Sequence, residues 1–234
     1  MRGLYAIIDV PSLSARQLDP VRFADAVLSA QPAAVQLRDK RLRAAETLAL
    51  LREIHGLSAS RAVPLFANDR PDLAALAGCE GVHLGQSDLP AALVRQVAAA
   101  AGTTLQIGMS VHDEDELDRA LGADCDYLAF GPVFGTTSKA NPEPTIGLAG
   151  LDRLLDRARD GFDGPLVAIG GLSLPSAPEV ARRCDSGAVI GALLDPAPAD
   201  ADQAEDGVYE RAAERARALH LALASGQLPS EDRS

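Results

Sequence analysis

Residues 107–147, IGMSVHDEDELDRALGADCDYLAFGPVFGTTSKANPEPTIG, contain the pattern that decides the fold. The stretch continues an apolar run, 105–109, that ends in the polar residues Ser110 and His112. An acidic helical pattern follows, and a second apolar run, 125–130, leads into a loop rich in Gly, Pro and Thr. The order strand, helix, strand is typical of a parallel α/β protein. Ligand-binding residues in such proteins follow the carboxyl ends of the strands, so we expect a site at these exits.

The same alternation extends over most of the chain, although we see no internal sequence repeat. Short apolar runs without polar alternation predict strands that are buried on both faces of a parallel sheet. Eight of them, separated by helical patterns, predict a single α/β domain, a closed (β/α)8 TIM barrel. The predicted strands are 4–8, 33–37, 64–67, 81–84, 105–109, 127–130, 165–169 and 187–190, and helices are expected after Asp19 and at 42–57, 72–77, 91–101, 151–158, 177–183 and 208–224.

The chain length is consistent with one domain. Its 234 residues, 47% hydrophobic, match the size of one α/β barrel. Residues 1–194 carry the strands and helices through the eighth strand. Residues 195–207 are an acidic, Pro- and Ala-rich surface connector, 208–224 form the final barrel helix, and 225–234 have the composition of a disordered tail.

Composition excludes several classes of function. A net charge of −11 argues against a nucleic-acid or anionic-membrane partner, and the absence of Trp argues against stacking on single-stranded nucleic acid. Three widely spaced cysteines without a CxxC motif predict reduced thiols in a cytoplasmic protein. The amino-terminal apolar run is too short for a signal peptide, and we expect no membrane span.

Basic residues follow the second predicted strand. Gln36, Arg38 and Lys40 stand at alternate positions, so their side chains point the same way from an extended backbone. Two cations and an amide on one face form a site for a polyanion such as a diphosphate. The alternative is a solvated strand end with ordinary surface charges.

Two carboxylates follow the third and fourth predicted strands. Asn68 and Asp69 leave one strand and Asp88 leaves its neighbour, so they meet at one rim of the barrel. Mg²⁺ is a hard ion that takes one or two carboxylates together with substrate oxygens, and we therefore predict that Asp69 and Asp88 bind magnesium. The alternative for each Asp is to cap the helix that follows it.

The remaining candidates lie after strands five to eight. Ser110 and His112 alternate out of the fifth strand, while His83 lies inside the fourth and is expected to be a core or tautomer-fixed residue rather than a ligand. The sixth strand leads into a long loop, typical of a ligand clamp. Glycines after strands seven and eight allow backbone N–H groups to approach a phosphate, although a tight turn would also require them. The loop and glycine candidates are Thr136, Ser138, Lys139, Gly170, Gly171 and Gly191.

No Ser-His-Asp order, HExxH, Walker-type loop or Rossmann glycine pattern is present in the sequence, so nicotinamide or flavin chemistry has no support. The chain does resemble thiamine phosphate synthases, in order, from Leu4 to about Leu194. The segments that carry the resemblance are AVQLRDK at 34–40, NDRPDLA at 68–74, GVHLGQSDLP at 81–90, IGMSVH at 107–112, FGPVFGTTSK at 130–139 and AIGG at 168–171.

The resemblance implies a TIM-barrel transferase of thiamine biosynthesis. Members of that family join an aminomethylpyrimidine diphosphate to a thiazole phosphate, release pyrophosphate and require Mg²⁺. It implies that Arg38, Ser110 and Lys139 act in catalysis and that Asp69 and Asp88 hold Mg²⁺. The implied substrate contacts are Gln36, Arg38, Lys40, Asn68 and Lys139 to the pyrimidine diphosphate, Ser110 to the pyrimidine, Thr136 and Ser138 to the thiazole, and Gly171, Ile190 and Gly191 to its phosphate.

Two positions depart from the family pattern, and both concern the thiazole side. The loop lacks the two prolines of Pro-Thr-Pro-Thr-Lys, and Gly191 stands where the family commonly has Ser, so we expect weaker binding of the thiazole phosphate. The closest rival is the related thiazole tautomerase, which would use His112 for proton transfer but has no use for paired carboxylates beside Arg38 and Lys40. A non-catalytic thiamine-phosphate-binding barrel is a third reading. The expected partners are small-molecule substrates and a second copy of the chain, as a homo-oligomer.

Overall fold

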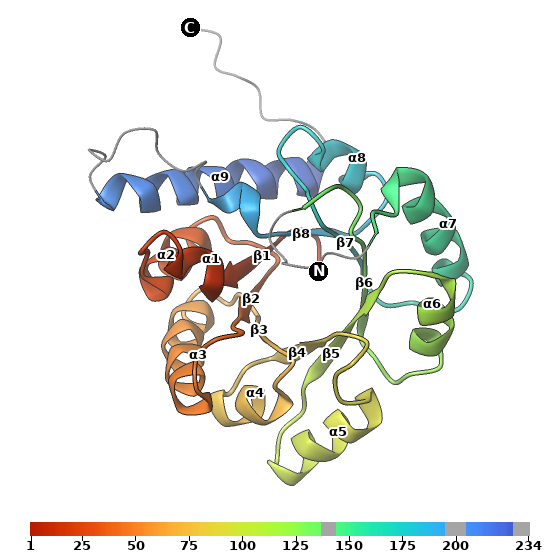
Figure 1. Ribbon diagram of the computed structural model, residues 1–234, viewed down its shortest axis with the longest axis horizontal. Coiled ribbons are helices and arrows are strands. Elements are labelled where there is room, and N and C mark those ends of the chain that lie inside the picture. Colours follow the sequence, from red (N-terminus) through yellow and green to blue (C-terminus); the bar gives the residue numbers. More distant parts are fainter. Residues whose placement is uncertain (137–143, 195–204, 227–234) are drawn as a thin grey trace, which may run out of the picture.

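Eight parallel strands close into a barrel in the computed structural model, which describes residues 1–136, 144–194 and 205–226. Neighbours along the chain pair in order from β1 to β8, and β8 returns to pair with β1. Figure 1 shows the strands as a central ring with the helices outside it. The (β/α)8 prediction is therefore confirmed. The strands are β1 (Gly3–Asp9), β2 (Ala34–Arg38), β3 (Leu65–Asn68), β4 (Gly81–Leu84), β5 (Gln106–Val111), β6 (Tyr127–Phe130), β7 (Leu166–Ile169) and β8 (Ser186–Val189).

The helices lie between the strands, and the last one crosses the junction between the first and last strands. In Figure 1, α9 runs beside α2 and α8 and covers the edge where β8 meets β1. In the described ranges, none of these helices is both long enough and apolar enough to span a bilayer. They are α1 (Val10–Ser14), α2 (Pro20–Leu28), α3 (Ala44–Ala59), α4 (Pro71–Ala77), α5 (Ala91–Ala100), α6 (Glu114–Leu121), α7 (Gly147–Arg159), α8 (Ala177–Ala181), the short 3₁₀ helix η1 (Gly191–Leu193) and α9 (Glu205–Ser225).

The predicted boundaries agree with the structure to within a few residues at most ends, and two short elements were not predicted. Asp9 ends β1, as expected, but its carboxylate also accepts the Ser12 N–H at 3.1 Å and so caps α1. Helix η1 directly follows β8. Both elements have about one turn, which is too short to produce a helical period in the sequence.

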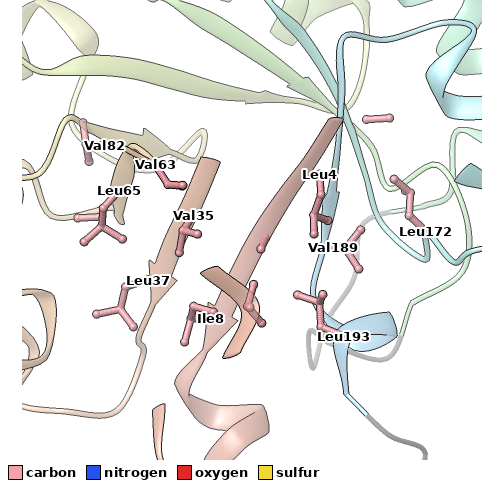
Figure 2. Close-up of a cluster of buried hydrophobic side chains, with 14 of the residues drawn as sticks. Leu4, Ile8, Val35, Leu37, Val63, Leu65, Val82, Leu172, Val189 and Leu193 are labelled. Carbon is pink, nitrogen blue, oxygen red and sulfur yellow. The ribbon is translucent and has the colours of Figure 1, made fainter. Parts of the chain in front are cut away.

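Apolar side chains fill two separate layers. Outside the strand ring, Leu4, Ile8, Val35 and Leu37 belong to a large cluster that the helices cover, as Figure 2 shows. Inside the ring lies a smaller cluster. Because side chains alternate across a strand, each strand feeds both layers, which explains why the apolar runs show no polar alternation. The inner cluster consists of Tyr5, Ile7, Ala34, Phe66, Tyr127, Ala129, Val167 and Ala188.

Aromatic rings dominate the inner cluster, and glycine makes room for them. Tyr5, Phe66 and Tyr127 pack with ring centroids 5.5–5.9 Å apart, two of the three pairs edge to face. A Cβ added to Gly108 would lie 1.9 Å from the Tyr127 ring, and one at Gly81 would lie 2.4 Å from Phe66. These two glycines are therefore required by close approach inside the barrel rather than by backbone conformation.

Carboxylates at the amino-terminal rim stabilise the strand starts. Glu80, Asp126 and Asp185 each follow a cysteine and directly precede an even-numbered strand. Their side chains accept backbone N–H groups of the preceding strand, from Leu65 at 2.8 Å, Ile107 at 2.7 Å and Leu166 at 2.9 Å. This local repeat, which we did not predict, lies at the rim where barrel residues serve stability.

Candidate active site

A cavity of about 540 Å³ opens at the carboxyl ends of the strands. Every strand or the loop after it contributes to its wall, which is the usual arrangement of a ligand site in this fold. Ser138 and Lys139 lie outside the described residues, but every other predicted site residue lines this cavity. They are Gln36, Arg38, Lys40, Asn68, Asp69, Asp88, Ser110, Thr136, Gly171, Ile190 and Gly191.

The two cations on the β2 side are held by carboxylates. Arg38 Nη1 lies 2.5 Å from Asp9 Oδ1, and the Asp9 side chain is only 1% exposed. Lys40 forms an ion pair with Asp69. The sequence analysis named no anionic neighbour for either cation, whereas the structure gives each of them one. Asp9 was missed as a site residue, although it follows Tyr5 and Ile7 on the inner face of β1 at the two-residue period of a strand.

Asp69 and Asp88 face each other across the rim between β3 and β4. The Asp69 backbone has a φ of +64° and its N–H donates to His83 O at 2.8 Å. Asp88 Oδ2 accepts the Gly85 N–H at 2.7 Å. Burial raises the pKa of Asp88, and the Asp69 carboxylate beside it adds to the rise. The Asp69 carboxylate is thus close enough to disfavour the charge on Asp88.

Neither carboxylate caps a helix, so the alternative reading of these residues is wrong. The residue at the N-cap of α4 is Arg70 and that of α5 is Pro90, and neither helix start has a side-chain cap. Among the described residues, there is no group of three or more His, Cys, Asp or Glu side chains that is arranged to hold a metal ion. Two adjacent oxygen donors that repel one another do fit a hard cation that takes its other ligands from substrate and water.

Ser110 and the buried His83 form the deeper wall of the cavity. His83 Nε2 lies 3.0 Å from Ser110 Oγ, and His83 Nδ1 lies 2.9 Å from the hydroxyl of Tyr127. His83 is 7% exposed, as expected of a core residue, yet it also lines the cavity. The sequence alone placed it in the core because its position inside β4 does not show that the side chain reaches the cavity.

His112 is oriented by an acid from the following helix. Glu116 Oε2 contacts both the His112 backbone N–H and His112 Nδ1, each at 2.7 Å. His112 lines the cavity, and this contact holds its ring through Nδ1. Glu116 lies in the first turn of α6, and the sequence analysis did not identify it as a partner of His112.

The opposite wall consists of glycine-rich backbone. The φ of Gly171 is +63°, and a Cβ on this residue would lie 2.3 Å from Gly135 O. The loop after β6 lies against it, with Phe134 N–H donating to Gly170 O at 2.9 Å. Across from this turn, η1 begins at Gly191 and presents its first peptide groups to the cavity. Close packing requires Gly171, and it also leaves the backbone N–H groups accessible.

Cysteine chemistry has no place in this cavity. All three thiols are free, and none of them lines the cavity wall. Burial raises the pKa of Cys79 and Cys184 to about 12 and that of Cys125 to about 11. Thiols with such pKa values are protonated at neutral pH and are poor nucleophiles.

Known proteins are similar to this chain over most of its length. The family described as thiamine monophosphate synthase matches residues 4–193. The thiamine-phosphate synthase of Anaeromyxobacter dehalogenans is 38% identical over 200 residues, which are 85% of this chain and 83% of that protein. That of Koribacter versatilis is 40% identical over 82% of this chain and 88% of its own length. The solved thiamine phosphate pyrophosphorylase from Pyrococcus furiosus aligns with a TM-score of 0.70 and 27% identity, covering 92% of this chain and 95% of that one.

Proposed function

The chain belongs to the thiamine monophosphate synthase family, and from that premise we propose how its cavity carries out the reaction. The enzyme is a transferase that joins an aminomethylpyrimidine diphosphate to a thiazole phosphate and releases pyrophosphate. The observation that carries the proposal is the distribution of charge around one cavity. Arg38, Lys40 and the two acids Asp69 and Asp88 lie at one end, and uncharged glycine backbone lies at the other.

The charged end suits a diphosphate. Arg38 is held in place by Asp9 and offers planar N–H groups to phosphate oxygens. Lys40 adds a second positive charge, and Asn68 a neutral donor, from the same rim. Lys139, in the long loop after β6, is the third cation that we assign to this ligand. Together these groups stabilise the negative charge that grows on the leaving diphosphate.

Asp69 and Asp88 would hold Mg²⁺ beside that diphosphate. The fit rests on their proximity, since the Asp69 carboxylate raises the pKa of Asp88 and a bound cation would offset the negative charge of both groups. When bound, the ion supplies Lewis-acid neutralisation of the phosphate oxygens. Asp69 would exchange its ion pair with Lys40 for this role, which would release the ammonium group towards the phosphates.

The middle of the cavity suits the pyrimidine ring and the glycine end suits the thiazole phosphate. Gln36 and Ser110 offer an amide and a hydroxyl to the ring edge. Thr136 and Ser138 would contact the thiazole. The turn at Gly171 and the start of η1 at Ile190 and Gly191 would bind its phosphate through backbone N–H groups.

Positioning and charge stabilisation account for the chemistry. The bond between the pyrimidine methylene carbon and the diphosphate oxygen breaks, and its electron pair leaves with the diphosphate. The lone pair of the thiazole nitrogen then forms the new C–N bond to the same carbon. This substitution needs no protein nucleophile, in agreement with the three protonated thiols. It does need both substrates held in line, which the two ends of one cavity can do.

The test is pyrophosphate release by the purified protein, with Mg²⁺ and both substrates, and with each of the three omitted in turn. Release that requires all three supports the proposal. The His112–Glu116 pair favours one second candidate, the thiazole tautomerase, in which His112 would move a proton. Interconversion of thiazole isomers without pyrophosphate release would transfer the function to that candidate. A thiamine phosphate complex without either reaction would indicate a binding protein.

The cellular location and the oligomeric state of the enzyme remain predictions. Small-molecule substrates follow from the family, whereas the cytoplasmic location and the homo-oligomer rest on the sequence alone.

A further inference from the structure

Five polar side chains form one continuous hydrogen-bonded row inside the barrel. Gln36 Nε2 donates to the Tyr5 hydroxyl at 3.0 Å, and that hydroxyl lies 2.9 Å from the hydroxyl of Tyr127. Tyr127 lies 2.9 Å from His83 Nδ1, and His83 Nε2 lies 3.0 Å from Ser110 Oγ. The row begins and ends at residues that line the cavity, and its two tyrosines are fully buried. We call these five residues the interior relay.

Packing fixes the relay in place. The ring of Tyr127 packs edge to face against Tyr5 and Phe66, and His83 stacks on it with centroids 5.6 Å apart. Gly108 makes the room that the Tyr127 ring occupies, since a Cβ at position 108 would lie 1.9 Å from that ring. Burial raises the pKa of both tyrosines, so each keeps its hydroxyl proton and has one hydrogen bond to donate.

The chemistry of the groups gives the relay a direction. An amide nitrogen can only donate, so Tyr5 accepts from Gln36. In the assignment that gives both tyrosine hydroxyl protons an acceptor, Tyr5 donates to Tyr127 and Tyr127 donates to His83 Nδ1, so a neutral imidazole carries its proton on Nε2. That proton is donated to Ser110 Oγ. The Ser110 hydroxyl is left to donate into the cavity, and the carbonyl oxygen of Gln36 is left to accept.

We infer that the interior relay fixes this acceptor and this donor and thereby makes the cavity select an aminopyrimidine ring over the matching oxopyrimidine. An aminopyrimidine presents amino N–H donors beside a ring nitrogen that accepts, which complements Gln36 and Ser110. The lactam form of an oxopyrimidine presents the reverse pattern, a carbonyl oxygen beside a ring N–H. Tyr5 and Tyr127 act through Gln36 and Ser110 and are therefore positioning residues. The inference rests on the proposed function, because it concerns the pyrimidine end of the same site.

The variant that tests the relay is Tyr127→Phe, which keeps the ring packing and removes two links. Tyr5→Phe is the second variant. It removes the hydroxyl that accepts from Gln36 but leaves the contact between Tyr127 and His83. Tyr209→Phe is the matched control. It removes a buried tyrosine hydroxyl that accepts the Asp19 N–H at 3.0 Å, far from the cavity wall. Urea unfolding of all three establishes that each variant is folded.

The kinetic readout compares the aminopyrimidine diphosphate with its oxo analogue. The wild type and Tyr209→Phe are expected to prefer the amino substrate by about 100-fold in kcat/KM, since a buried site rejects a ligand that leaves its hydrogen-bonding groups unpaired. Tyr127→Phe is expected to reduce both this preference and kcat/KM for the amino substrate by about 10-fold, the effect of one such bond. The KM for thiazole phosphate is expected not to change.

The second readout needs no substrate. Nitrogen-15 NMR of the histidine rings reports the tautomer of His83, whose signals are identified by their loss in His83→Gln. The relay requires the proton on Nε2 in the wild type and in Tyr209→Phe, and a mixture of tautomers in Tyr127→Phe. A wild-type proton on Nδ1, or the same tautomer in Tyr127→Phe, overturns the inference.

The two readouts separate the inference from the proposed function. If the tautomers behave as stated but the wild type does not release pyrophosphate, the proposed function fails and the relay stands. If the wild type is active and Tyr127→Phe keeps its full preference for the amino substrate, the relay fails and the function stands.

Discussion

Asp88→Asn is expected to make the metal-free protein more stable while it abolishes magnesium-dependent turnover. Burial, and then the nearby Asp69 carboxylate, raise the pKa of Asp88 above its ordinary value. The folded protein therefore binds this proton more tightly than the unfolded chain does. The stability that the group contributes is fully present below the ordinary pKa and is lost as the pH rises through the raised pKa. At neutral pH a charged Asp88 is thus a destabilising group, and Asn removes the charge.

The expected gain in stability is small, because Lys40 and solvent screen the repulsion between Asp69 and Asp88. After a discount for this screening, we expect the free energy of unfolding to rise by about 0.5–1 kcal/mol, which for a chain of this size raises Tm by about 1–4 °C. Mg²⁺ at a hundred times its dissociation constant is expected to stabilise the wild type by about 2.7 kcal/mol and the variant by almost nothing. The order of stability of the two proteins therefore inverts when magnesium is added.

The assay is thermal unfolding at several pH values, with and without Mg²⁺, together with pyrophosphate release. Asp156→Asn is the control, since it removes one carboxylate from the exposed surface of α7, away from the cavity. The difference between wild type and Asp88→Asn without metal is expected to shrink as the pH falls. Equal stabilisation of both proteins by Mg²⁺, or a metal-free Asp88→Asn that is less stable than the wild type, would refute the reasoning.

Three further changes test other parts of the site. Arg38→Lys keeps the charge but loses the planar fork, and we expect the KM for the pyrimidine diphosphate to rise about 10-fold in steady-state kinetics, with that for the thiazole phosphate unchanged. Gly171→Ala places a Cβ 2.3 Å from Gly135 O at a φ of +63°, so urea unfolding is expected to show a loss of about 2–3 kcal/mol. Cys79 and Cys184, both buried and with pKa values of about 12, are expected to react with a thiol reagent only after unfolding, as measured by absorbance with and without urea.

The barrel could be predicted from the sequence because its signal is repeated and local. Eight apolar runs, each followed by a helical pattern, leave few alternatives to a closed parallel sheet. Position along a strand then predicts which residues meet at the rim, which is why Lys40, Asp69 and Asp88 were found without a structure. The prediction needed only the alternation of side chains and the parallel direction of the strands.

What could not be predicted were the partners of the site residues. Asp9 contacts Arg38, and Tyr127 contacts His83, across strands that are far apart in the sequence. A single sequence gives the face on which each side chain lies, but it does not give the side-chain conformations that decide the contacts. The glycine at position 108 illustrates the limit, since its role depends on the size of a ring from another strand.

The internal ion pairs show how a chain with a net charge of −11 could accommodate the proposed diphosphate. At the amino-terminal rim, Asp126 and Asp185 accept backbone N–H groups, so their charges are satisfied in the folded protein and need no ligand. At the carboxyl-terminal rim, Lys40 is paired with Asp69, and Asp88 lies beside that pair.

A ligand at this rim does not simply add charge to a basic surface. In the proposed function the ligand would exchange partners, with its phosphate oxygens taking the Lys40 ammonium group while the freed carboxylates take a cation. The affinity would then depend on the difference between two sets of ion pairs rather than on their sum. On this proposal, local pairing, and not the net charge of the protein, would decide which ligand the cavity accepts.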